Sequence, residues 1–172
     1  RTLEEFGEDP LVWPTVAIVV PVYNEGPTIL KTADSFQGLD YPRDKLQVVF
    51  IDDRSTDDTF QHLQTVAKTY PWMKVIQNEK NVGKRLGIKS AVLVTHTDLI
   101  MSVDSDVIVD PSALRTLVRH MFASGCDAAG GCVYVSNADE NWLTRMQAVK
   151  YWIGYQFLKN VENAFSHIMC LS

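Results

Sequence analysis

Short apolar blocks rich in β-branched residues alternate along the chain with stretches whose apolar residues recur every three or four positions. Four blocks predict buried β-strands, at residues 16–20, 46–51, 73–76 and 99–103. A helix is predicted after each strand, beginning at Pro27, near Thr59, after Arg85 and after Pro111. Because strands that alternate with helices are typical of βα units, the pattern predicts an α/β fold with a mostly parallel, doubly wound sheet flanked by helices.

The predicted helices each carry an apolar side that faces the core. These apolar positions are Ile29, Ala33 and Phe36 in the first helix, Phe60, Leu63 and Ala67 in the second, and Leu114, Leu117, Val118 and Met121 in the fourth. Gly38 and Gly125 are expected to end the first and fourth helices. Asp110 and Pro111 supply an N-cap and a first-turn proline to the fourth helix.

The last third of the chain continues the pattern less regularly. Residues 126–135 predict a further strand, loosened at Gly130-Gly131, where the missing side chains leave room for a ligand or another backbone. Residues 142–165 predict a long amphipathic helix. This helix either joins the core or docks on a membrane portion through Trp152 and Tyr155.

Composition is that of an ordinary globular domain. Of the 172 residues, 46% are hydrophobic and 22% are charged, which excludes disordered and low-complexity classes. No linker or internal repeat is present, so residues 1–172 are expected to form a single domain. The 16 Lys and Arg against 21 Asp and Glu leave a net charge of −5, which argues against a nucleic-acid partner.

Two classes of site are also disfavoured by the residues. The 3 cysteines lack C-x-x-C spacing and indicate neither a disulfide framework nor a zinc site, and the 4 histidines show no ligand spacing. The sequence contains no P-loop and no G-x-G-x-x-G motif. No apolar run reaches the roughly 20 residues of a membrane helix, so no transmembrane segment is expected within the chain.

The informative pattern is the position of the acids. Asp52-Asp53 and the pair Asp104 and Asp106 each follow a predicted strand, and the carboxyl ends of parallel strands form the ligand crevice of such folds. An extended Asp104-Ser105-Asp106 backbone would direct both carboxylates to one side, where they could hold Mg²⁺ or Mn²⁺ together with substrate phosphates. The alternative is that these acids only form turns, and Asp57 is expected mainly to cap the helix near Thr59.

A second feature is the pair of cations that follows a glycine. Gly83-Lys84-Arg85 precedes a predicted helix, and cations beside a flexible residue suit the neutralisation of a diphosphate. The alternative for this segment is a solvated surface loop.

The motifs, taken in order, resemble those of the family 2 glycosyltransferases, whose catalytic domain has the GT-A fold. The matching segments are Pro21-Val22-Tyr23-Asn24-Glu25, the stretch from Ile51 to Thr59, Gly83-Lys84-Arg85, and Val103-Asp104-Ser105-Asp106. Within the family, Tyr151-Trp152, Glu162, Phe165 and Cys170-Leu171-Ser172 are most similar to the membrane-bound polysaccharide synthases. These are the chitin synthase, the nodulation chitooligosaccharide synthase and the hyaluronan synthase.

The resemblance implies a role for each matching residue. Asp53 would contact the uracil of a UDP-sugar, with Asp52 beside it, and Asp104 and Asp106 would hold Mg²⁺ or Mn²⁺ on the diphosphate. The other implied donor-binding residues are Lys84 and Arg85 near the phosphates, Pro21, Tyr23 and Glu25 along the nucleotide pocket, and Gly131 behind the donor sugar.

Two departures from the family pattern stand out. The usual D-D-G-S has become Asp53-Arg54-Ser55, so the turn lacks its glycine and gains a cation that either contacts phosphate or faces solvent. The family's acceptor-side acid, its general base, and its Q-x-x-R-W segment would fall beyond Ser172. The chain is therefore expected to be the donor-binding part of a catalytic domain, inactive alone, with the acceptor-side portion absent.

The resemblance implies an inverting, metal-dependent enzyme that uses a UDP-sugar, UDP-N-acetylglucosamine in particular, to extend a β-linked polysaccharide. The implied partners are the donor and an oligosaccharide or polysaccharide acceptor, at the cytoplasmic face of a membrane and in an integral membrane protein. The alternatives are a soluble single-addition transferase, a non-catalytic nucleotide-sugar sensor and a phospho-acceptor receiver domain. Against the receiver domain, the first strand ends in Pro21 to Glu25 and not in paired acids.

Overall fold

The computed structural model describes residues 8–136, 138 and 140–154 of the chain. Its contacts divide the chain into two compact units, residues 1–119 and 120–172. The single domain expected from the sequence stays a prediction. The predicted site residues all lie in the first unit, except Gly131.

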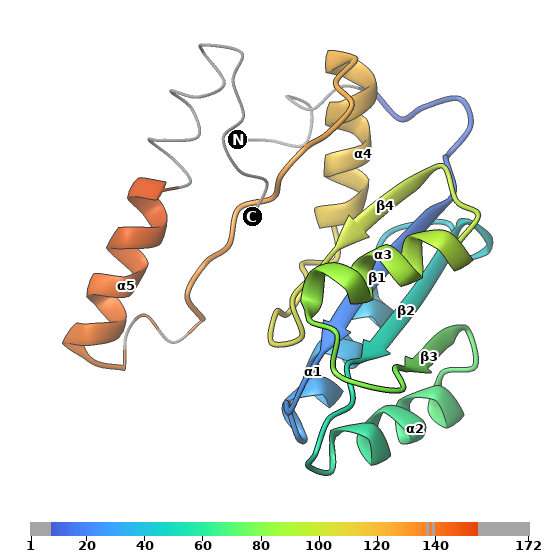
Figure 1. Ribbon diagram of the computed structural model, residues 1–172. Helices are drawn as coiled ribbons and strands as arrows, with labels where there is room; N and C mark the ends of the chain where they lie inside the picture. Colours follow the sequence, from blue (N-terminus) through green and yellow to red (C-terminus); the bar gives the residue numbers. More distant parts are fainter. Residues whose placement is uncertain (1–7, 137, 139, 155–172) are drawn as a thin grey trace. The chain divides into compact units, whose positions relative to one another are not determined.

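The first unit is built on a four-stranded parallel sheet (Figure 1). Its strands are β1 Val16–Val22, β2 Leu46–Asp52, β3 Met73–Gln77 and β4 Leu99–Ser102, in the spatial order β3-β2-β1-β4. All four predicted strands are confirmed. The chain runs outward from β1 to β3 and then returns to place β4 on the other side of β1. The strand order therefore reverses between β1 and β4, which is the switch point of a doubly wound sheet.

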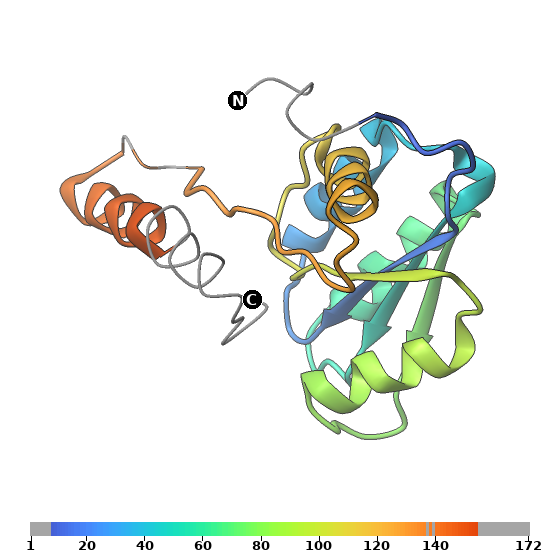
Figure 2. The same cartoon turned by 90° about the horizontal axis from the view of Figure 1, so that it is seen from above.

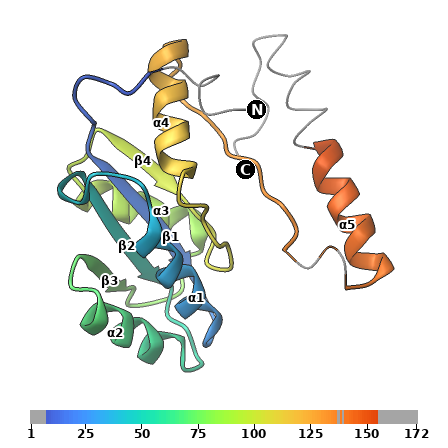
Figure 3. The ribbon, with the colours of Figure 1, turned by 180° about the vertical axis from the view of Figure 1, so that it is seen from behind.

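Helices cover both faces of this sheet. Helices α1 Thr28–Ser35 and α2 Thr59–Thr69 pack on one face with the first turns of α4 Ala113–Ser124, and α3 Lys84–Val94 packs on the other (Figures 2 and 3). Two single 3₁₀ turns, η2 Phe36–Gly38 and η3 Arg43–Lys45, connect α1 to β2. The predicted α/β architecture with flanking helices is confirmed.

The apolar side of α1 lies where the sequence placed it. Ile29, Ala33 and Phe36 are each 0% exposed and belong to the main core with alternate residues of β1 and β2. The α2 prediction was partly wrong, because the fully covered positions are Thr59, Leu63 and Val66, while Phe60 and Ala67 are half-buried. Thr59 faces the interior, where its hydroxyl oxygen accepts two backbone hydrogen bonds from the loop after β1, and the side of α2 that it shares with Leu63 and Val66 is therefore the buried one.

The second unit departs from one prediction and confirms the start of another. Residues 126–135 form no strand in the structure, and Gly130-Gly131 weakens strand formation there. Helix α5, Trp142–Trp152, begins at an Asn141 capping box, but none of its residues is buried. The part of the predicted helix towards Phe165 lies outside the described residues. Within the described part of the chain, no helix has the length and apolar character needed to cross a membrane.

Phe36 gives a direct test of the core. Phe36→Ala is expected to lower the free energy of unfolding by about 3–5 kcal/mol, because it removes a fully buried ring whose centroid lies 6.1 Å from the centroid of the Phe50 ring. Urea unfolding measures the loss. Phe122→Ala is the matched control, since Phe122 is 56% exposed and should cost much less. Equal losses at the two positions would contradict the packing described here.

Candidate functional site

The candidate site is formed by four loops at the carboxyl edge of the sheet. Residues 23–26 follow β1, residues 53–58 follow β2, residues 78–83 join β3 to α3, and residues 103–106 follow β4. All four belong to the first unit, and parallel pairing brings them to the same edge (Figure 1). The edge holds all the predicted acids and both predicted cations.

The loops after β1 and β2 are joined by hydrogen bonds that use side chains as backbone partners. The Asn24 N–H donates to Ser55 Oγ at 3.0 Å, and Asn24 Oδ1 accepts the Thr56 N–H at 2.8 Å. Thr59 Oγ1 accepts the N–H groups of Glu25 and Gly26 at 2.8 and 2.7 Å. Asn24 and Gly26 both have a φ of +53°, and these bonds hold the loop in that left-handed backbone.

Asp52 is fully buried, and both of its carboxylate oxygens accept hydrogen bonds. Its Oδ1 accepts the Ser55 N–H at 3.2 Å and the Ser55 hydroxyl, and its Oδ2 accepts the Gln77 side-chain amide at 2.8 Å. The side-chain oxygen of the same Gln77 accepts from Arg54 at 3.3 Å. Arg54 stands where the usual D-D-G-S pattern has glycine. Its φ of +63° lies in the left-handed region, which glycine adopts most easily. Asp52 thus shapes the turn that carries Asp53.

Asp53 is 6% exposed, and its carboxylate accepts three hydrogen bonds from the loop before α3. Oδ1 accepts the Asn78 side-chain amide at 2.8 Å and the Val82 N–H at 2.9 Å, and Oδ2 accepts the Gly83 N–H at 2.7 Å. Burial raises the pKa of Asp53, but the hydrogen bonds from Val82, Asn78 and Gly83 outweigh it and hold the pKa below its ordinary value. The carboxylate is therefore charged at neutral pH.

The two predicted cations begin helix α3. Gly83, the N-cap, has a φ of +84°, which an L side chain rarely adopts. Lys84 Nζ lies 2.6 Å from Asp104 Oδ1, and both side chains are more than half exposed. Arg85 is exposed and has no hydrogen-bond or ion-pair partner among the described residues. The structure thus places the G-K-R and D-x-D motifs side by side.

The D-x-D segment is a turn, not the predicted extended backbone, since the Val107 N–H donates to the Asp104 carbonyl at 3.2 Å. Ser105 is buried: its hydroxyl donates to Glu25 Oε1 at 2.8 Å, and its carbonyl accepts from Thr32 at 2.7 Å. Asp104 and Asp106, the residues on either side of it, are exposed. The turn therefore separates the serine from the acids, as the sequence predicted for another backbone shape, because the serine's hydrogen bonds hold it inward.

The donor set of Asp104 and Asp106 fits a hard divalent cation. Both supply carboxylate oxygens in the open, and Mg²⁺ typically takes one or two carboxylates and completes its shell with water and substrate phosphate. No group of three or more His, Cys, Asp or Glu able to hold a metal occurs among the described residues. These residues suit a cation shared with a ligand better than an all-protein cage.

The remaining predicted residues are placed less centrally. Pro21 is half-buried in β1 and pairs with Ile51, and Tyr23 is 46% exposed beside the edge. The N-cap of α2 is Asp58, but Asp57 Oδ1 accepts the N–H of the first helical residue, Thr59, at 3.0 Å, and hydrogen bonds from Thr59 hold the pKa of Asp57 below its ordinary value. Among the described residues, a Cβ at Gly131 would meet no atom within 4 Å, and the placement of Gly131 behind a donor sugar stays a prediction.

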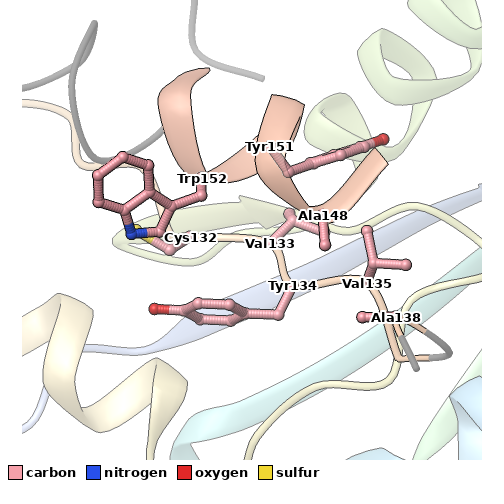
Figure 4. A pocket seen from close by; sticks show the side chains of 8 residues that line it. All are labelled: Cys132, Val133, Tyr134, Val135, Ala138, Ala148, Tyr151 and Trp152. Atoms are coloured by element: carbon pink, nitrogen blue, oxygen red, sulfur yellow. The ribbon is translucent and has the colours of Figure 1, made fainter. Parts of the chain in front are cut away.

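A separate apolar cavity lies in the second unit and contains no predicted site residue (Figure 4). Its volume is about 140 Å³, and it is lined by Cys132, Val133, Tyr134, Val135, Ala138, Ala148, Tyr151 and Trp152. Because no acid or cation lines it, the charged edge of the sheet remains the candidate site.

Three residues that shape the site were missed by sequence reasoning. Gln77 and Asn78 hold Asp52 and Asp53, and Ser105 binds Glu25. The position of Gln77 and Asn78 directly after a predicted strand, like the acids, was a usable signal. No local sequence signal predicted the hydrogen bond of Ser105, because its partner lies 80 residues away in the sequence.

A parallel sheet whose carboxyl edge gathers acids, two cations and a helix N-terminus is typical of α/β domains that bind nucleotides. Residues 17–171 match the family described as Glycosyl transferase family 2, and the chain belongs to that family. The glycosyltransferase resemblance drawn from the motifs is confirmed at this level.

Three similar curated proteins each carry the name N-acetylglucosaminyltransferase. That of Bradyrhizobium diazoefficiens is 32% identical over 171 residues, which is 98% of this chain and 35% of the relative. That of Neorhizobium galegae is 34% identical over 164 residues, 94% of this chain and 38% of the relative. That of Bradyrhizobium elkanii is 34% identical over 145 residues, 83% of this chain and 78% of the relative. The chain thus spans little more than a third of the first two.

Solved structures confirm the GT-A-type fold. A Pyrobaculum calidifontis mannosyltransferase in complex with GDP-Man and Mn²⁺ is 27% identical, with a TM-score of 0.66 over 77% of this chain and 41% of that one. S. aureus TarS in complex with UDP-GlcNAc is 22% identical, with a TM-score of 0.59 over 72% of this chain and 38% of that one. The second likeness shows the fold alone.

Thr59 tests the link between the loops after β1 and β2. Thr59→Val keeps the side-chain shape and leaves two backbone N–H groups without their acceptor, so the free energy of unfolding should fall by about 1–3 kcal/mol. Thr59→Ser keeps the acceptor and loses one methyl group, which costs about 0.8 kcal/mol. Chemical denaturation of both variants makes the comparison. A larger loss in the serine variant would disprove the proposed joining role.

The lowered pKa of Asp53 predicts how stability depends on pH. Its contribution is present above the unfolded pKa of about 3.9 and is lost as pH falls through the lower folded pKa. Asp53→Asn should therefore be less stable than the parent chain at pH 7, and the difference should shrink as pH falls below about 4. Denaturant midpoints measured across this range test the sign. A difference that stays constant with pH would show that the charge of Asp53 is not what stabilises the fold.

Proposed function

We propose that this chain binds the donor in an inverting, metal-dependent glycosyltransferase that takes N-acetylglucosamine from UDP-N-acetylglucosamine and extends a β-linked oligosaccharide or polysaccharide. The observation that carries the proposal is the 2.6 Å contact between Lys84 and Asp104, which unites the cation and acid motifs beside Asp53. The choice of sugar is supported by relatives that are named N-acetylglucosaminyltransferase.

Donor recognition follows from the hydrogen-bonding capacity of the edge. Asp53 Oδ2 accepts one hydrogen bond, from Gly83, and a carboxylate oxygen can accept a second. A uracil N–H is proposed to take that second position. Asp52 supports the turn from below, and Pro21, Tyr23 and Glu25 are proposed to border the nucleotide.

The diphosphate is proposed to lie between the two motifs. Lys84 and Arg85 supply positive charge, and the first turn of α3 adds the positive end of its helix dipole. Asp104 and Asp106 would hold Mg²⁺ or Mn²⁺, which supplies charge neutralisation to the departing UDP. A metal is supported by the donor set of this chain and by the mannosyltransferase structure, whose description names Mn²⁺.

In the proposed reaction, an acceptor hydroxyl attacks the anomeric carbon in line while UDP departs. The attack requires a general base that takes the hydroxyl proton. No residue of this chain is assigned to that role or to acceptor binding, and the chain spans 35% of its Bradyrhizobium diazoefficiens relative. Processive extension of a polymer at the cytoplasmic face of a membrane is the finer part of the proposal and rests on the sequence resemblance.

Two alternatives are distinguished by the reaction products. A single-addition transferase of the same fold would lengthen an oligosaccharide acceptor by one sugar, whereas the proposed enzyme yields a series of longer chains. A nucleotide-sugar sensor would bind UDP-N-acetylglucosamine without transfer. The receiver-domain alternative is contradicted by the family assignment.

Asp106 tests the metal and the donor together. In calorimetric titrations with UDP, Asp106→Asn should lose most of the affinity that Mn²⁺ adds, because one charged ligand is removed from an exposed turn. Asp44→Asn is the matched control, since Asp44 is exposed in η3 at the opposite, amino end of β2. It should bind like the parent chain. Mn²⁺-dependent UDP binding that is unchanged in Asp106→Asn would refute the metal assignment.

A further inference from the structure

The three hydrogen bonds to Asp53 all come from one loop, residues 78–83, which leads into α3. Two of them are donated by successive backbone N–H groups, those of Val82 and Gly83, and the third by the side chain of Asn78. Three hydrogen bonds of 2.7 to 2.9 Å to a buried carboxylate hold both the Asp53 side chain and the backbone of this loop in place. The end of β2 therefore determines where this loop lies.

Gly83 transmits this constraint to the helix. Its N–H is bound by Asp53, and its carbonyl accepts the N–H groups of Leu86 and Gly87, both at 3.1 Å. The first turn of α3 is thus attached to a residue whose position Asp53 holds. Lys84 is the next residue, and its ammonium group reaches Asp104 at 2.6 Å.

A continuous chain of contacts therefore crosses the site, from Asp53 through Gly83 to Lys84 and Asp104. We propose that Asp53 is a positioning residue for the diphosphate end of the donor: through Gly83 it places Lys84 where the phosphates bind. This inference rests on the proposed function, and it is separate from any contact between Asp53 and the base. A carboxylate limited to base recognition would need no hydrogen bonds to the start of α3.

Two further observations support the proposal. Asp52 is adjacent in sequence and also fully buried, yet its carboxylate accepts hydrogen bonds from Ser55 and Gln77, and none is recorded between it and residues 82–83. The link to α3 is thus specific to Asp53. Gly83 has the positive φ, +84°, that lets both its N–H and its carbonyl serve this link, and a Cβ at Gly83 would meet open space. The glycine is therefore required by its backbone conformation and not by crowding.

The test is a double-mutant cycle on UDP binding in the full chain, with Mn²⁺ present. Asp53→Asn and Lys84→Met should each weaken UDP binding by about tenfold or more, the size of one lost charge-assisted hydrogen bond. The double variant should lose less UDP affinity than the product of the two single losses, because a misplaced lysine and a missing one lose the same contact, and any base contact of Asp53 is lost equally in both backgrounds. Tyr23→Ala combined with Lys84→Met is the matched control and should show multiplied effects, because Tyr23 lies in the loop after β1, outside the link from Asp53 through Gly83 to Lys84.

The ratio of UDP to CDP affinity separates positioning from base contact, since the N3 of uracil is a donor and that of cytosine an acceptor. If Asp53 positions Lys84, the coupling in the cycle remains whatever happens to this ratio. If the losses of UDP affinity caused by Asp53→Asn and Lys84→Met simply multiply in the double variant, the positioning role is wrong. The proposed function would still stand in that case, provided that the parent chain binds UDP. Failure of the parent chain to bind UDP would refute the proposed function itself.

A second variant keeps the proposal testable if Asp53→Asn does not fold. Gly83→Ala leaves the Asp53 carboxylate intact and disturbs only the backbone that it holds. Its loss of UDP affinity should be absent in the Lys84→Met background, and its UDP-to-CDP ratio should equal that of the parent chain. An affinity loss of equal size in both backgrounds would overturn the proposal. Circular dichroism melting of every variant identifies those that are folded.

Discussion

The parallel pairing of β1 with both β2 and β4 is the constraint on which the rest of the structure depends. It joins Val22 to Asp52 across one side of β1 and Val19 to Ser102 across the other. All three strands then end at the same edge, so the loops that carry acids in three separate parts of the sequence must meet there. Strands buried on both faces allow this arrangement, and nearly every residue of β1 is covered.

Burial of polar groups at this edge is made tolerable by complete hydrogen bonding. Asp52, Asp53, Thr59 and Ser105 are all buried, and each is hydrogen-bonded to a group from another strand or loop. Among the described residues, no buried side-chain nitrogen or oxygen lacks a hydrogen-bond partner. Because an unpaired buried polar group is costly, these bonds favour a single arrangement of the loops over its alternatives. The edge thus combines a buried, fully hydrogen-bonded layer with exposed charged side chains.

The buried and the exposed acids of the edge have different roles. The buried acids, Asp52 and Asp53, hold loops in place, while Asp104, Asp106, Lys84 and Arg85 remain exposed to a ligand. Exposed charges of both signs suit a negatively charged nucleotide that is bound with a cation, since each sign neutralises the other until the ligand arrives. The Lys84–Asp104 pair is partly solvated and contributes little to stability, so its value lies in placing charge.

The sequence by itself determined the four strands, their parallel arrangement and the presence of Asp52, Asp53, Asp104 and Asp106 at one edge. These features follow from local patterns: β-branched runs, helical spacing and polar residues at strand ends. Sequence reasoning failed at residues 126–135, where a β-rich pattern has no neighbouring strand to pair with among the described residues.

Only the tertiary structure decided what each carboxylate binds. Gln77 and Asn78 reach Asp52 and Asp53 from the next strand, Ser105 reaches Glu25, and Lys84 reaches Asp104. These partners lie 20 to 80 residues apart in the sequence, so no local spacing encodes them. Which acid is buried and which faces a ligand depends on hydrogen bonds that form only when the sheet has brought its loops together.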